Sequence, residues 1–304
     1  MALDRDRFRG ALVGLAAGDA VGTTLEFKQP GTFQPIDDMV GGGPFGLTPG
    51  QWTDDTSMAL CLAESLVECD GELDPADQLT RYHRWWRDGH LSSTGVCFDI
   101  GITTTKAIKR WKNDRLVTDA VIDDEACANG SLMRLAPVPM RWAADPAEAG
   151  ERSAESSRTT HPAQRPVDTC RVLGTMIAVA IGGAPKDEVL DPARFADVDL
   201  HPLVQQIVDG SYRTKEPPEI RGTGYCIDAL EAALWAFDRA DDYRDAVLAA
   251  ANLGDDADTT AAICGQIAGA FWGESGIPAE WCRRLALKNT VSDLADGLWS
   301  LATD

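Results

Sequence analysis

The sequence predicts an all-α protein. Apolar residues recur at helical spacing through most of the 304 residues, and alternating strand patterns are nearly absent. There is no βαβ rhythm and no GxGxxG motif behind an apolar strand. No stretch resembles an interdomain linker, so we expect one domain, residues 1–304, folded as a compact orthogonal helical bundle. A chain of this length buries roughly 75% of its unfolded surface and needs no disulfides for stability.

Twelve segments show the helical pattern. The first, residues 8–20, places Ala11, Gly14, Leu15 and Gly18 on one face, and these small residues predict close packing against another helix. The third, residues 75–89, is rich in aromatic residues. In chain order the predicted helices are 8–20, 56–69, 75–89, 101–111, 147–159, 166–181, 202–210, 226–239, 243–253, 259–272, 278–287 and 291–301.

Three Gly- and Pro-containing segments interrupt this pattern and are predicted to be loops: residues 29–51, 184–199 and 214–224. The first is long and includes VGGGPFGLTPGQW. Long loops inside compact domains are often functional. A functional role is therefore expected for residues 29–51.

The composition excludes some partners. With 34 Asp and 14 Glu against 21 Arg and 7 Lys, the formal net charge is −20, which argues against binding a nucleic-acid backbone. The basic residues of 106–115 are interpreted as a solvated face. The sequence has no run of about 18 apolar residues, so no membrane span is expected. The charged residues 1–9 precede no signal-peptide core, so no secretory signal is expected. We expect a cytoplasmic protein, and we expect it to be a monomer.

The eight cysteines form no CxxC pair, and most lie in apolar helical sequence. We interpret them as buried free thiols in a reducing compartment. A thiolate zinc site or a redox pair is the alternative.

Clustered acids lie directly before two of the predicted helices, in the segments Thr53-Asp54-Asp55-Thr56 and Asp255-Asp256-Ala257-Asp258-Thr259-Thr260. Either segment alone is explained by capping, because carboxylates and hydroxyls accept from free N–H groups and suit the helix dipole. A cap needs one acceptor, however, and both helices are small and apolar, as buried helices are. Burying so many carboxylates near one another is costly unless cations neutralise them. Oxygen ligands favour Mg²⁺ or Mn²⁺ over zinc.

Three other features are candidates for the same site. Glu26 follows the first helix in an apolar neighbourhood, although a lone acid there is more often on the surface. The turn Asn129-Gly130-Ser131 exposes backbone N–H groups that can hold a phosphate, or it is an ordinary Asn-Gly turn. His161 can support a phosphate, although a lone histidine is more often structural.

These motifs, in this order, resemble the ADP-ribosylglycohydrolase family, whose bacterial archetype reactivates dinitrogenase reductase. The matching segments span nearly the whole chain, and the last is the most specific. They are GDAVGTTLEF (18–27), WTDDTSMAL (52–60), NGSLMRLAP (129–137), SRTTHP (157–162) and GDDADTTAAICG (254–265).

The resemblance implies a helical fold with two metal ions, Mg²⁺ or Mn²⁺, at the bottom of a cleft. Glu26 matches an acid near the metals, Asp99 in GVCFDIG matches an acid that faces the substrate, and Tyr225 matches an aromatic residue that stacks on it. The implied metal ligands are Thr53, Asp54, Asp55, Asp256, Asp258 and Thr259. The residues implied to hold the diphosphate or adenosine are Asn129, Gly130, Ser131 and His161.

The implied activity is hydrolysis of ADP-ribose from a modified side chain, most readily arginine, by a metal-activated water at ribose C1″. Glu26 would act as a general acid–base and Asp99 would hold the guanidinium, with Asp54 and Asp55 completing the catalytic set. Direct displacement by water at C1″ and a route through opening of the ribose ring are both compatible with these residues. The expected partner is an ADP-ribosylated protein or a small ADP-riboside.

Three other interpretations remain open at this point. The same metal site would serve serine-linked ADP-ribose, O-acetyl-ADP-ribose or another small ADP-riboside. A family member can also hold ADP-ribose without cleaving it, although the acid set is intact here. The third is a structural helical protein whose acidic helix starts are only caps.

Overall fold

The computed structural model describes residues 3–117, 123 and 125–303, and within these ranges the regular structure is entirely helical. The α-helices are α1 (Arg5–Gly22), α2 (Asp54–Glu68), α3 (Pro75–Asp88), α4 (Ile102–Asp114), α5 (Pro137–Arg141), α6 (Pro146–Ser157), α7 (Gln164–Ile181), α8 (Lys186–Val189), α9 (Pro202–Val208), α10 (Cys226–Arg239), α11 (Tyr243–Ala251), α12 (Ala257–Trp272), α13 (Ala279–Arg284) and α14 (Lys288–Thr303). Short 3₁₀ turns are η1 (Thr23–Leu25), η2 (Pro192–Phe195), η3 (Ser211–Arg213) and η4 (Glu274–Gly276). The all-α prediction is confirmed.

All twelve predicted helices are present, and two were missed. The missed helices, α5 and α8, have only 5 and 4 residues, too few to show a periodic pattern. The long loop over residues 29–51 is confirmed; its only pairing among described residues is an isolated bridge between Gly42 and Leu47. None of the described helices is long and apolar enough to span a membrane.

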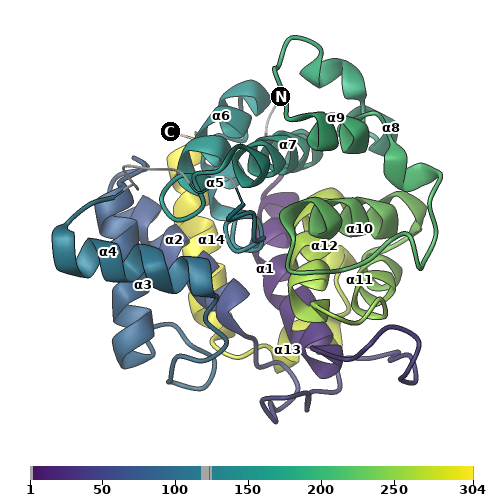
Figure 1. Ribbon diagram of the computed structural model, residues 1–304, viewed down its shortest axis with the longest axis horizontal. Coiled ribbons are helices and arrows are strands. Elements are labelled where there is room, and N and C mark those ends of the chain that lie inside the picture. Colours follow the sequence, from purple (N-terminus) through teal and green to yellow (C-terminus); the bar gives the residue numbers. More distant parts are fainter. Residues whose placement is uncertain (1–2, 118–122, 124, 304) are drawn as a thin grey trace.

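Helices α1 and α12 form the centre of the molecule, with α2, α3 and α4 on one side and α10 and α11 on the other (Figure 1). Their contact is made of small residues. A Cβ on Gly14 would lie 2.3 Å from the carbonyl oxygen of Gly265, and one on Gly18 would lie 2.2 Å from that of Ala261. The two backbones therefore touch, and the predicted close packing of this face is confirmed.

The two acidic segments lie at helix N-termini, but the helices begin two residues earlier than predicted. Asp54 and Asp55 are the first two residues of α2 rather than residues before it, and Asp258 is the second residue of α12. The predicted starts, Thr56 and Thr259, were late because the acids were interpreted as preceding the helices, whereas Asp54, Asp55 and Asp258 adopt helical backbone.

None of the eight cysteines forms a disulfide, and six are buried. Burial raises the pKa of Cys97 to about 12 and that of Cys170 to about 11. Such thiols are not reactive nucleophiles, in agreement with their interpretation as packing residues.

Candidate active site

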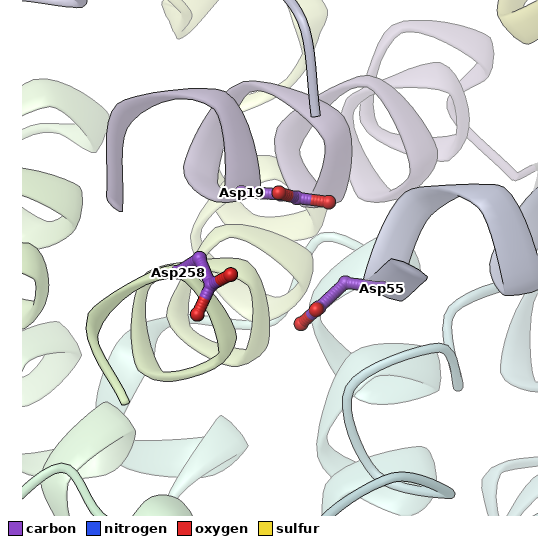
Figure 2. A group of neighbouring side chains, drawn as sticks. All are labelled: Asp19, Asp55 and Asp258. Atoms are coloured by element: carbon purple, nitrogen blue, oxygen red, sulfur yellow. The ribbon is translucent and has the colours of Figure 1, made fainter. Parts of the chain in front are cut away.

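Carboxylates from three helices meet beside the contact of α1 and α12. Figure 2 shows Asp19 of α1, Asp55 of α2 and Asp258 of α12 pointing toward one another. One oxygen of each lies within 4.8 Å of the others, and all three side chains are buried. A second group, Glu26, Asp99 and Asp258, meets the same distance limit. Asp258 belongs to both groups, so the two acid clusters are adjacent.

Asp19 was not among the predicted site residues. Its carboxylate accepts hydrogen bonds from the backbone N–H and the hydroxyl of Thr53, at 2.9 and 3.0 Å, and from the same two groups of Thr56, at 3.0 and 2.7 Å. It therefore caps α2 from a different helix. Within the sequence Asp19 is one polar residue in a helix of small residues, and only its burial shows that it belongs to the site.

Glu26 caps α12 in the same way. Its Oε2 accepts from the backbone N–H of Ala257 at 2.9 Å and lies 3.5 Å from that of Asp258. The N-cap residues of the two helices, Thr53 and Asp256, make no capping hydrogen bond with their own side chains. The capping interpretation of the acidic segments therefore does not account for them, because the caps come from Asp19 and Glu26.

Two buried carboxylate oxygens in this cluster, Oδ1 of Asp55 and Oδ2 of Asp258, have no hydrogen-bond partner among the described residues. An unpaired, buried carboxylate oxygen is expensive. The Oδ2 atom of Asp55 lies 3.5 Å from the hydroxyl of Thr259 and 3.1 Å from the hydroxyl of Thr53. This set of oxygen donors fits a hard divalent cation.

The pKa values of these acids are raised. Burial is the main cause for each, followed by repulsion from neighbouring carboxylates, chiefly Asp258. The pKa values of Asp19 and Asp256 are raised to about 7 and that of Asp99 to about 8. Those of Glu26, Asp54 and Asp55 are also raised. The second cause is repulsion from Asp99 for Asp54 and from Asp19 for Asp55. These carboxyl groups therefore cannot all be ionised at once unless cations are bound beside them.

A cavity of about 230 Å³ opens over the acids. Its floor and walls include the predicted residues Glu26, Asp54, Asp99, Asn129, Gly130, His161, Asp256 and Thr259. Thr53, Asp55 and Asp258 lie buried in the acid cluster and are not part of the cavity surface. The first turn of α4 and Phe27 also line the cavity, and neither was predicted.

One wall of the cavity is the turn at 129–131. The Asn129 amide donates to Asp256 at 2.7 Å, which ties this turn to the start of α12. The N–H groups of Gly130 and Ser131 donate to no carbonyl in the described part of the chain. The Ser131 hydroxyl bonds to Ser157 at 2.8 Å and does not line the cavity.

Tyr225 lies next to Gly224, a cavity residue, but is not itself in the lining. Its hydroxyl accepts from Arg165 at 3.0 Å, and the Arg165 guanidinium lies 5.7 Å from the ring centroid. The structure thus brings together the other predicted residues around or under one cavity and places Tyr225 beside it.

A helical bundle with a cleft floored by acids from separate helices is suited to the hydrolysis of a glycosidic bond. The comparisons agree: the sequence model of the ADP-ribosylglycohydrolase family matches residues 1–304. The chain belongs to this family of glycosyl-bond hydrolases.

Several relatives are close in sequence. The chain is 44% identical over 297 residues to "ADP-ribosylarginine hydrolase Tri1" of Pseudomonas putida (strain GB-1), covering 98% of this chain and 79% of the relative. It is 32% identical over 303 residues to "ADP-ribosyl-[dinitrogen reductase] glycohydrolase" of Rhodospirillum rubrum, covering 98% and 97%. A solved structure, "ADP-ribosylglycohydrolase-related protein complex", superposes with a TM-score of 0.86 at 40% identity and 98% coverage of each chain.

Proposed function

We propose that this enzyme hydrolyses the bond between ADP-ribose and the guanidinium of arginine in a modified protein, with two divalent cations, Mg²⁺ or Mn²⁺, in its acid cluster. The observation that carries the cation proposal is the pair of buried, unpartnered oxygens on Asp55 and Asp258. The arginine proposal rests on Asp99 and is supported by the name of the Pseudomonas relative.

The residues proposed to hold the cations are the oxygen donors at the starts of α2 and α12: Thr53, Asp54, Asp55, Asp256, Asp258 and Thr259. Cations bound there would neutralise the carboxylates and lower the pKa of water near the reacting carbon. Asp19 lies in the same cluster, but its oxygens already accept four hydrogen bonds from α2 and the preceding residue. We therefore assign Asp19 to positioning the donors rather than to the donor set.

In the proposed reaction, water adds to ribose C1″, the C1″–N bond breaks, and the nitrogen takes up a proton and leaves as the guanidine of arginine. Glu26 is the residue proposed to accept a proton from the water. Its Oε2 is held by the start of α12, so the exchange is assigned to Oε1. Oxocarbenium character is expected at C1″ as the C1″–N bond breaks.

Asp99 is proposed to bind the leaving guanidinium. It is partly exposed, lines the cavity, and has a carboxylate oxygen within 4.8 Å of those of Glu26 and Asp258. Its backbone is in the left-handed region with φ 59°, an uncommon conformation for a non-glycine residue. A carboxylate held at this position can pair with a guanidinium in a bidentate manner, which a serine hydroxyl does not offer.

The test compares arginine-linked and serine-linked ADP-ribosyl protein as substrates, with Mg²⁺, with Mn²⁺ and after chelation. We expect cation-dependent release from arginine and little release from serine. Asp55→Ala should lose more than the roughly 10–100-fold typical for partners of metal ligands. Asp293→Ala, an exposed acid on α14, is the matched control and should retain parent activity.

Asp99→Asn tests the linkage. A charged pair contributes about 1.5–3 kcal/mol, so this variant should lose roughly 10–100-fold on the arginine-linked substrate. Equal activity of the parent on both linkages, or an equal loss by Asp99→Asn on both, would contradict the arginine assignment. Full activity after exhaustive chelation would contradict the cation proposal.

A further inference from the structure

Behind the 129–131 turn lies a buried arginine with no acidic partner. Arg134 is 1% exposed, and no described carboxylate lies within ion-pair distance of it. Its guanidinium rests on the ring of Tyr82, with 4.8 Å to the centroid. Its Nη1 donates to the carbonyl oxygen of Gly130 at 2.8 Å, and its Nη2 donates to the Thr160 hydroxyl at 2.6 Å. A buried charge without a counterion is costly, so its position calls for an explanation.

The contact with Arg134 sets the direction of the next hydrogen bond. A guanidinium has only donors, so Thr160 Oγ1 must accept from it. The hydroxyl has one proton of its own, and Thr160 Oγ1 lies 2.7 Å from Nδ1 of the adjacent His161. If Nδ1 carried a proton, the buried Thr160 proton would have no acceptor among the described residues, which is unfavourable. Thr160 therefore donates to Nδ1, and the neutral imidazole carries its proton on Nε2.

The Nε2 edge of His161 lies at the 129–131 turn. A Cβ placed on Gly130 would lie 3.1 Å from Nε2 and 2.9 Å from Cε1, and both residues line the cavity. Burial, reinforced by the charge of Arg134, lowers the pKa of His161 to about 3, so the ring is neutral. Only a glycine at position 130 leaves room for the ring beside the free N–H groups of the turn.

We propose that Arg134 and Thr160 are positioning residues that hold His161 as the Nε2–H tautomer, so that it donates a hydrogen bond to an anionic oxygen bound at the 129–131 turn. With the proposed function, on which this part rests, that oxygen belongs to the diphosphate of ADP-ribose. The uncompensated charge of Arg134 acts in the same direction, because it places positive potential under this turn in a chain of net charge −20.

The test uses the 304-residue protein and three variants, with a fourth for spectral assignment. Thr160→Val removes the hydroxyl and keeps the shape, and Thr160→Ser restores it. Thr159→Val is the control: Thr159 is equally buried, but its hydroxyl bonds to Gln78 at 3.4 Å. The tautomer of His161 is read from the ¹⁵N shifts of its ring by NMR, which is practicable because the chain has four histidines. Assignment comes from a His161→Gln spectrum.

We expect the Nε2–H tautomer in the parent, in Thr160→Ser and in Thr159→Val, and its partial or complete loss in Thr160→Val. The dissociation constant for ADP-ribose and the KM should rise about 3–10-fold in Thr160→Val with kcat nearly unchanged, because one hydrogen bond to a remote part of the substrate is weakened. If a general packing defect caused the losses in Thr160→Val, Thr160→Ser would not recover both the tautomer and the affinity.

The proposal is overturned if the parent carries the proton on Nδ1, or if Thr160→Val keeps both the parent tautomer and the parent affinity. If the parent binds no ADP-ribose, the proposed function fails instead. The NMR comparison, repeated with inorganic pyrophosphate as the anion, still decides the positioning role.

Discussion

The carboxylate of Asp19 accepts both the backbone N–H and the hydroxyl of Thr53, at 2.9 and 3.0 Å, although 34 residues separate them in the chain. This contact joins the end of α1 to the first turn of α2. It orients the residues that carry Asp54 and Asp55, so the geometry of the acid cluster depends on a residue outside both acidic segments.

Asp19→Ala is therefore expected to weaken both the fold and the site. It removes the side-chain cap of α2 and leaves buried donors on Thr53 and Thr56 without this acceptor. Loss of a cap and of such acceptors costs about 1–3 kcal/mol each. Thermal unfolding should show a lower Tm, and isothermal titration should show weaker Mn²⁺ binding. The control variant Asp293→Ala, at an exposed acid of α14, should leave both the Tm and Mn²⁺ binding unchanged.

Glu26→Gln is expected to separate turnover from folding. Glutamine retains an oxygen that can accept from the N–H of Ala257, so the cap on α12 is conserved while proton exchange is lost. General acid–base catalysis contributes about 10²–10⁴-fold, and kcat should fall within that range. Steady-state assays measure kcat, and an Mn²⁺ titration shows whether the variant still binds the metal. Parent-like kcat in a variant that binds Mn²⁺ normally would move the proton transfer to another residue.

Without cations, stability should fall as the pH rises. Asp19 and Asp256, whose pKa values are raised from near 4 to about 7, and Asp99, raised to about 8, bind protons in the folded state that the unfolded chain releases above pH 4. Their contribution to stability is present below pH 4 and is lost as the pH rises toward 8. Divalent cations should reverse this loss.

The measurement is Tm at pH 5, 6, 7 and 8, with and without Mg²⁺ or Mn²⁺. Each kcal/mol corresponds to roughly 2–4 °C. The increase in Tm on adding the cation should grow with pH and should be small in Asp55→Ala. A cation effect that is equal at pH 5 and pH 8 would show that these acids are not the binding groups.

Gly18→Ala tests whether the contact of α1 with α12 sets the site. Its new Cβ would lie 2.2 Å from the Ala261 carbonyl oxygen, so the helices must move apart. Overpacking of this kind costs about 1–3 kcal/mol, and both Tm and activity should fall. Gly297→Ala on α14 is the control, because the atoms nearest to its Cβ belong to the Val67 side chain, the closest at 3.0 Å, and alanine favours a helix. Full activity in Gly18→Ala would show that the site tolerates a wider spacing.

The sequence by itself determined the helical class, because the 3.6-residue period of apolar positions is a local property of each segment. It also pointed to the acids at the starts of α2 and α12, since runs of carboxylates before apolar residues are visible without a fold. The stripe of small residues on α1 was recognisable for the same reason. The starts of α2 and α12 were placed two residues late because periodicity does not register a polar first turn.

Only the tertiary structure decided how these parts combine. The caps of α2 and α12 come from Asp19 and Glu26, which lie 34 or more residues away from the groups they bind. That Asp258 belongs to two acid groups, and that Arg134 lies without a counterion behind His161, follow from how the helices cross. Periodicity specifies which face of a helix is buried, but the partner of that face depends on packing between distant segments. The sequence therefore indicated most of the acids proposed to carry the chemistry, and the packing of α1 on α12 decided which of them meet.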